Sequence, residues 1–187
     1  ILPKSPIFKI TFSKLNFRKQ LLREHSKKNA LIIAHFILDH PDKMNDFVSI
    51  FLNKEPIISQ RAAMSISAID DINPKLLTPF VNKLMDALKE SGHHIAVVRV
   101  TLRVLRTAKL PSERATELID YCIEKVSNPK SPIAIKVFSI NILTRYCNEY
   151  PELKNEVQSI IEDLLTHENS AGIRSCGPKA LKTISKL

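Results

Sequence analysis

The side chains in this sequence that recur in a pattern suited to binding are basic. They occur at gaps of 38, 37 and 38 residues, at Arg61, Arg99, Lys136 and Arg174. Arg103 and Arg106 follow Arg99, and on a helix wound at about 100° per residue these three arginines form one narrow stripe. Guanidinium and ammonium groups bind carboxylates and phosphates, so we predict a basic binding stripe made of these six residues. The alternative is that the recurring basic residues bond to acidic or backbone groups inside the fold, which applies less readily to Arg103 and Arg106.

Patterns for catalysis, metal binding or cofactor binding are weak. His93 and His94 are adjacent and would point about 100° apart on a helix, so they chelate one metal poorly, and we expect them at a helix end. The acidic pairs Asp70-Asp71 and Glu162-Asp163 have no partner carboxylate on another element, and we expect Asp70-Asp71 to bind the region of Arg61 or Arg99. We therefore predict no catalytic residues, no metal and no cofactor.

The glycines and cysteines also form no pattern for catalysis, metal binding or cofactor binding. The sequence has three glycines, too few for a phosphate-binding loop or for a fold rich in tight hairpins. Its three cysteines, Cys122, Cys147 and Cys176, form neither a disulfide framework nor a zinc pattern. We expect them to be small buried hydrophobic residues in a reducing compartment.

The net charge of +9 is concentrated at the two ends of the chain. Residues 1–30 hold eight basic residues and one acidic residue, and residues 170–187 hold four basic residues and no acidic one, whereas residues 31–169 carry a net charge of −2. Basic ends could contact an acidic partner or a nucleic acid, or be solvated termini. No apolar run reaches the roughly 18 residues that a membrane span needs, and residues 1–12 do not resemble a signal peptide, so we expect a cytoplasmic protein.

Regularly spaced prolines divide the chain into helical segments. Pro41, Pro74, Pro111 and Pro151 each close one apolar segment and open another. Amphipathic first helices are expected over residues 42–53, 75–90, 112–126 and 152–167. More uniformly apolar second helices are expected over residues 30–38, 57–69, 95–108, 133–147 and 173–184. We predict an irregular lead-in over residues 1–16, one domain over residues 17–187, and an interruption of the last helix at Gly177-Pro178.

The segment 92–111 is the central copy of this pattern. Its valines also permit a strand over residues 97–104, with Val98, Val100, Leu102 and Val104 on one face. The corresponding segments elsewhere do not alternate in this way, so a helix is favoured. As a helix it is apolar on nearly every side except the arginine stripe, so other elements must cover it on several sides.

Four short segments resemble HEAT or armadillo-like repeats. They are Leu76-Leu77-Thr78-Pro79-Phe80 with Val98-Arg99, Gln60-Arg61-Ala62-Ala63-Met64, and Gly172-Ile173-Arg174. The resemblance implies an all-α fold, a right-handed α-α superhelix of about five helix pairs whose inner helices line a concave surface. It also implies a non-catalytic scaffold that binds a macromolecule, and we expect a protein partner at the concave basic stripe.

Two other functions remain as alternatives. The basic residues and the repeat type are also similar to those of HEAT-like DNA alkylation-repair proteins, which makes nucleic-acid binding the alternative. The sequence has no tryptophan and shows no residue-by-residue match to those glycosylases, so their activity is not carried over. An enzyme of unfamiliar type is a third possibility, and no feature of the sequence indicates an oligomeric state.

Overall fold

The computed structural model describes residues 15–187, which form an array of α-helices with three short 3-10 helices. Within these residues there is no β-strand. Leu15 and Asn16 precede the first helix in irregular conformation, whereas the rest of the expected lead-in, residues 1–14, lies outside the described residues. The α-helices are α1 (Phe17–Arg23), α2 (Lys27–Asp39), α3 (Met44–Phe51), α4 (Pro56–Ile72), α5 (Val81–Lys89), α6 (Ile95–Leu105), α7 (Ser112–Ser127), α8 (Ile133–Glu149), α9 (Lys154–His167) and α10 (Ala171–Ile184).

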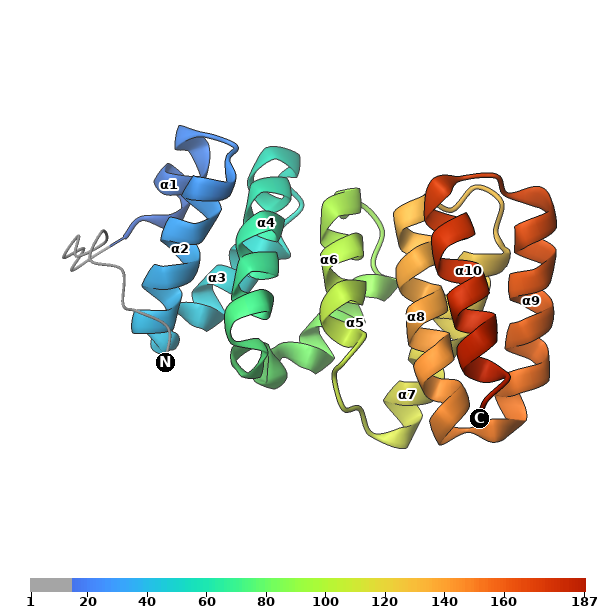
Figure 1. The fold of residues 1–187 in the computed structure, drawn as a ribbon. Helices are drawn as coiled ribbons and strands as arrows, with labels where there is room; N and C mark the ends of the chain where they lie inside the picture. The colour runs from blue at the N-terminus through green and yellow to red at the C-terminus, as the bar shows by residue number, and fades with distance from the viewer. Residues whose placement is uncertain (1–14) are drawn as a thin grey trace, which may run out of the picture.

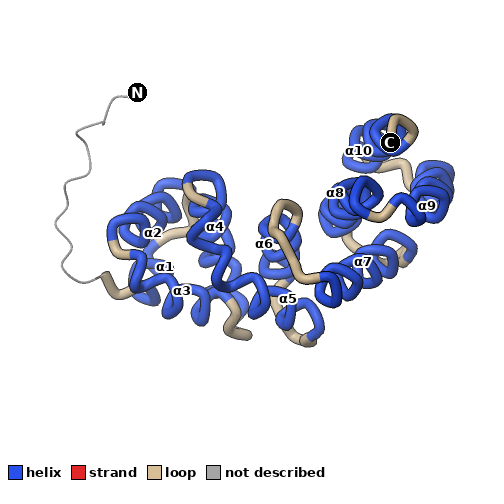
Figure 2. Tube along the Cα trace, turned by 90° about the horizontal axis from the view of Figure 1, so that it is seen from below, coloured by secondary structure: helices blue, strands red, loops and turns tan. Residues whose placement is uncertain are grey.

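The helices form five consecutive pairs, from α1 with α2 to α9 with α10. The second helices of the pairs, α2, α4, α6, α8 and α10, stand side by side in one row (Figure 1). Seen from below, this row lines the concave side of an arch, and α3, α5, α7 and α9 lie on its outer side (Figure 2). The predicted all-α solenoid of about five helix pairs is therefore confirmed.

Prolines set the beginnings of the helices, as the sequence predicted. Three of the four outer helices begin with a short 3-10 segment that starts at a proline: η1 (Pro41–Lys43), η2 (Pro74–Phe80) and η3 (Pro151–Leu153). Proline fits the first helical turn because its missing N–H would have no partner there. Pro111 directly precedes α7. The expected helices are all present, and their ends differ from the expected ones by a few residues.

The predicted interruption at Gly177-Pro178 is wrong. The α10 helix runs without a break from Ala171 to Ile184 with Pro178 inside it. Pro178 is exposed, so the carbonyl group that loses its hydrogen bond can be hydrated. Gly177 is buried against α9, and a Cβ atom there would lie 2.9 Å from a methyl carbon of Leu165. The glycine therefore serves close packing between α9 and α10.

Two apolar clusters form the core, and they meet at α5 and α6. Ala96, Val97, Val100 and Val104 of α6 belong to the cluster of the N-terminal half. Leu102 and Leu105 of the same helix belong to the cluster of the C-terminal half. This explains why the central helix is apolar on nearly all sides, and it confirms a helix rather than a strand. Among the described residues, no helix combines the length and apolar character that crossing a bilayer requires.

Candidate functional site

The six basic residues of the predicted stripe divide into two groups. Arg61, Arg103 and Lys136 form contacts inside the fold. The exposed ones are Arg99, Arg106 and Arg174, and none of these three forms an ion pair or a side-chain hydrogen bond with another residue in the described part of the chain. A continuous row of six exposed cations is therefore not what the fold presents.

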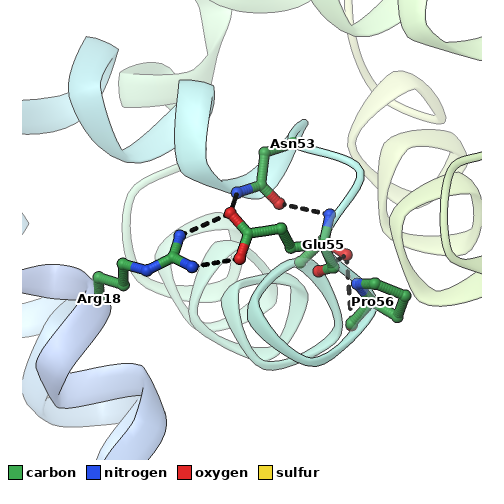
Figure 3. Close-up of polar contacts among 5 residues, drawn as sticks. Arg18, Asn53, Glu55 and Pro56 are labelled. Atoms are coloured by element: carbon green, nitrogen blue, oxygen red, sulfur yellow. Dashed lines mark hydrogen bonds and ion pairs between the residues drawn. The ribbon is translucent and has the colours of Figure 1, made fainter.

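Arg61 joins α4 to the first helix pair. One guanidinium nitrogen of Arg61 donates a hydrogen bond of 2.8 Å to the carbonyl oxygen of Leu21, near the end of α1. On the same side of the molecule, Arg18 of α1 forms a bidentate ion pair with Glu55 (Figure 3). The Glu55 carboxylate also accepts a hydrogen bond of 3.1 Å from Asn53. These contacts hold α1 against the beginning of α4.

Arg103 reaches the C-terminal end of α4. Its Nε lies 3.2 Å from an oxygen of Asp70, and another guanidinium nitrogen binds Asp71. Negative charge in the last turn of a helix is unfavourable, and Arg103 supplies the compensating positive charge. Burial raises the pKa of Asp70, and the hydrogen bond and charge of Arg103 oppose that rise. The expected ion pair between Asp70-Asp71 and the Arg99 region is confirmed.

Lys136 lies beneath the surface of α8 rather than on it. Its side chain is 2% exposed, and its Nζ is 3.9 Å from a carboxylate oxygen of Glu168, the residue that follows α9. That distance is too long for a hydrogen bond. Lys136 also lines a cleft of about 540 Å³ between α7, α8 and α9, together with Asp163 and His167. This lysine therefore cannot form part of an exposed concave stripe.

Arg99 and Arg106 are the exposed cations at the centre of the row of inner helices. Arg99 lies on α6, and Arg106 directly follows the last residue of this helix, with Arg103 between them along the chain. The helix contains no acidic residue. The nearby acidic groups at the end of α4, Asp70 and Asp71, are bound by Arg103, and the charge of Arg106 also acts on Asp70. The positive charge of Arg99 is therefore the more available of the two to a partner.

Two exposed isoleucines at the beginnings of α4 and α6 were not predicted. Ile57 in the first turn of α4 is 57% exposed, and Ile95 in the first turn of α6 is 47% exposed. Each precedes a recurring arginine, Arg61 or Arg99, by four residues, so the two isoleucines occupy the same position in adjacent repeats. The 38-residue gap between them was a signal that the sequence could have yielded. Large exposed apolar side chains that repeat on one surface are typical of a protein-binding site.

A further residue that the sequence did not single out is Arg145 of α8. It donates hydrogen bonds to carbonyl oxygens at the end of α6, at 2.7 Å to Arg106 and 3.0 Å to Ala108. Its guanidinium carbon lies 4.2 Å from the ring centre of Tyr146. Arg145 thus binds carbonyl groups at the C-terminal end of α6, and Arg103 binds carboxylates at the C-terminal end of α4. Arginine contacts between consecutive inner helices are a repeated device of this array.

The histidines and cysteines have structural surroundings. The His94 ring accepts a hydrogen bond of 3.1 Å from the N–H of Ala96 and thereby caps α6, which confirms the expected place at a helix end. His93 lies in the same loop with its side chain 2% exposed, 3.6 Å from Glu90. Burial raises the pKa of Cys122 to about 12, so its thiol is neutral and inert. No cluster of three or more metal-ligating side chains occurs within residues 15–187.

Comparison with known families identifies the repeat. A family model described as a HEAT repeat domain matches residues 17–184, which is most of the chain. Comparisons with curated proteins and with solved structures gave no significant match. The match extends over all five helix pairs, including both ends of the concave row. The chain therefore belongs to the HEAT repeat domain family.

Proposed function

We propose that this protein is a non-catalytic scaffold that binds a partner protein on its concave surface, centred on α4 and α6. One observation carries the proposal: Ile57 and Ile95 are exposed at equivalent positions near the exposed cation Arg99. HEAT repeats generally mediate protein interactions, and this repeat type supports the same role here.

Burial of the two exposed isoleucines by a partner would be energetically favourable. Fully burying an isoleucine side chain stabilises a complex by about 1.5–3 kcal/mol, and these two are roughly half exposed in the free chain. Met64 and Ala68 continue the partly exposed surface of α4 along the helix. A partner that covers this surface gains apolar contact, and the arginines orient the partner.

Nucleic-acid binding is the second candidate, because exposed arginines also bind phosphates. The apolar surface at Ile57 and Ile95 offers nothing to a phosphate backbone. Among the described tyrosines, Tyr146 is buried, and Tyr121 and Tyr150 pack against the C-terminal cluster, so none is an open stacking platform for a base. Protein binding is therefore favoured. The alternative includes a relation to HEAT-like DNA alkylation-repair proteins and is tested by titrating duplex DNA at two salt concentrations.

A displayed library of folded protein fragments tests the proposal. Binders selected on the full chain should lose affinity when Ile95→Ser or Ile57→Ser is introduced, because the apolar contact is lost. Lys83→Ala on the outer helix α5 is the matched control, and it should leave the affinity unchanged. Binders that tolerate every substitution on α4 and α6 would show that the concave surface is not the site. Steeply salt-dependent binding of duplex DNA that requires Arg99 and Arg106 would replace protein by nucleic acid as the ligand.

A further inference from the structure

The N-terminal halves of α4 and α6 combine exposed apolar groups with positive charge. Ile57 and Ile95 lie in the first turns of the two helices, and Arg99 follows Ile95 by one turn. The two helices are adjacent in the inner row and begin at the same edge of the array (Figure 1). Partial positive charge at helix N-termini adds to that of Arg99.

The acidic groups that the described residues place around this surface are bound by other side chains, including Glu90 at the end of α5, which lies 3.1 Å from the Nζ of Lys54. Asp70 and Asp71 lie in the last turn of α4, at the opposite end of the surface, and Arg103 binds both. Glu55, at the beginning of α4, is bound by Arg18. Arg61 points its guanidinium at the carbonyl of Leu21. The surface between Ile57 and Arg99 therefore favours negative charge.

The spacing of the two isoleucines fits a helix. Packed helices have axes about 8–10 Å apart, so equivalent residues on α4 and α6 are separated by roughly that distance. Residues i and i+7 of an α-helix share a face and are about 10.5 Å apart along its axis. A helix laid across α4 and α6 can place one apolar residue over Ile57 and another over Ile95. Acidic residues three or four positions from the second apolar residue then lie on the same face, within reach of Arg99.

We infer that the partner presents an acidic amphipathic helix, which crosses α4 and α6 with apolar residues at i and i+7 over Ile57 and Ile95 and a carboxylate over Arg99. The inference rests on the proposed function, since it names the chemistry of the partner at the same surface. Charge complementarity selects acidic over basic helices, because a like charge placed at Arg99 is repelled. The exposed isoleucines select an amphipathic helix over a purely acidic chain.

A displayed library of helical peptides with randomised surface positions tests the inference. The target is the full chain, and peptides that it enriches are expected to carry Asp and Glu, with apolar residues seven positions apart. Arg99→Glu should weaken the enriched peptides roughly tenfold, because an attraction becomes a repulsion. Lys83→Glu on α5 introduces the same charge change on the outer side and should leave binding unchanged.

Swapping the charges of the peptide and the protein tests specifically for electrostatic contact between them. Replacing the enriched acidic residues of a peptide by lysine should restore its binding to the Arg99→Glu variant. Arg99 is exposed, so the circular dichroism spectrum and the melting temperature of the variant should match those of the unmodified chain. If Arg99→Glu is misfolded, Arg99→Gln takes its place and should weaken the acidic peptides severalfold.

The outcomes separate the two proposals. Enriched peptides that are basic or uncharged, yet lose binding on Ile57→Ser or Ile95→Ser, would overturn the acidic class and leave the concave protein-binding site in place. Peptides that respond to neither the isoleucine nor the arginine substitutions would contradict the proposed function itself. Acidic peptides without the seven-residue apolar spacing would overturn the crossing geometry.

Discussion

The guanidinium group of Arg103 on α6 lies 3.2 Å from the carboxylate of Asp70 in the last turn of α4. The Asp70 side chain is 10% exposed, and the Arg103 side chain is 29% exposed. The pair joins residues of two helices that are 33 positions apart in the chain. It fixes the α4–α6 surface on which the proposed binding site depends.

Removing Arg103 should destabilise the array. Arg103→Ala leaves Asp70 and Asp71 at a helix C-terminus without a counter-charge and should lower the free energy of unfolding by about 1–3 kcal/mol. Urea unfolding followed by circular dichroism measures this. Arg99→Ala, on the same helix, removes an exposed side chain with no partner in the described structure and should change stability by less than about 0.5 kcal/mol. Equal effects of the two substitutions would contradict the assigned role.

The ion pair between Arg18 and Glu55 should make stability depend on pH. The hydrogen bond and charge of Arg18 lower the pKa of Glu55, so the ionised form is favoured in the folded chain. Its contribution is present above the pKa of Glu55 in the unfolded chain and is lost as the pH falls through the lower pKa of the folded state. Glu55→Gln should therefore reduce stability at neutral pH but have little effect near about pH 3. A difference that stayed constant over this range would show that the pair contributes nothing.

Lys136 is expected to cost stability in its present surroundings. Its ammonium group is buried and lies 3.9 Å from its nearest carboxylate, that of Glu168. Desolvation of such a charge often exceeds the attraction within the pair. Lys136→Met retains the volume without the charge and should raise the free energy of unfolding by about 1 kcal/mol, whereas Lys136→Ala should lower it because a cavity remains. A loss of stability in Lys136→Met would instead identify the ion pair as stabilising.

The cysteines should differ in reactivity in the folded chain. Alkylation requires the thiolate, and burial raises the pKa of Cys122 to about 12 while its side chain is inaccessible. Cys176 is partly exposed. Iodoacetamide at mildly alkaline pH should label Cys176 and leave Cys122 unmodified until the chain is denatured, as peptide mass spectrometry can measure. Similar labelling rates for both thiols in the native chain would be inconsistent with the buried position of Cys122.

The helix pairs were predictable because their signals are local. Prolines at helix beginnings and apolar residues at helical spacing act within a few positions of the chain. The continuity of α10 through Pro178 was not predictable, since it depends on an exposed carbonyl and on the contact between Gly177 and Leu165 of α9. That contact joins two helices, so the local sequence of neither helix indicates it.

Arg99 and Lys136 differ in burial, and they also differ by one position within their helices. Arg99 is the fifth residue of α6, whereas Lys136 is the fourth residue of α8. One position rotates a side chain by about 100° around a helix. The recurring gaps of 37 and 38 residues looked equivalent in the sequence, yet Arg99 is exposed and Lys136 is buried. Arg174 is also the fourth residue of its helix but is exposed, since no helix pair follows α10 in the described structure. The assignment of Arg103 and Arg106 likewise required the position of Asp70 on the neighbouring helix.

The division of the core at α6 has a mechanical consequence. Since α6 supplies one wall to each of the two apolar clusters, a slight roll of this helix between them would alter the curvature of the arch. The distance from Ile57 to Ile95 spans two helices and would change with that roll, whereas the distance from Arg99 to Arg106 lies within one helix and would stay fixed. A roll of α6 would therefore change the spacing of the two isoleucines and leave that of the two arginines unchanged.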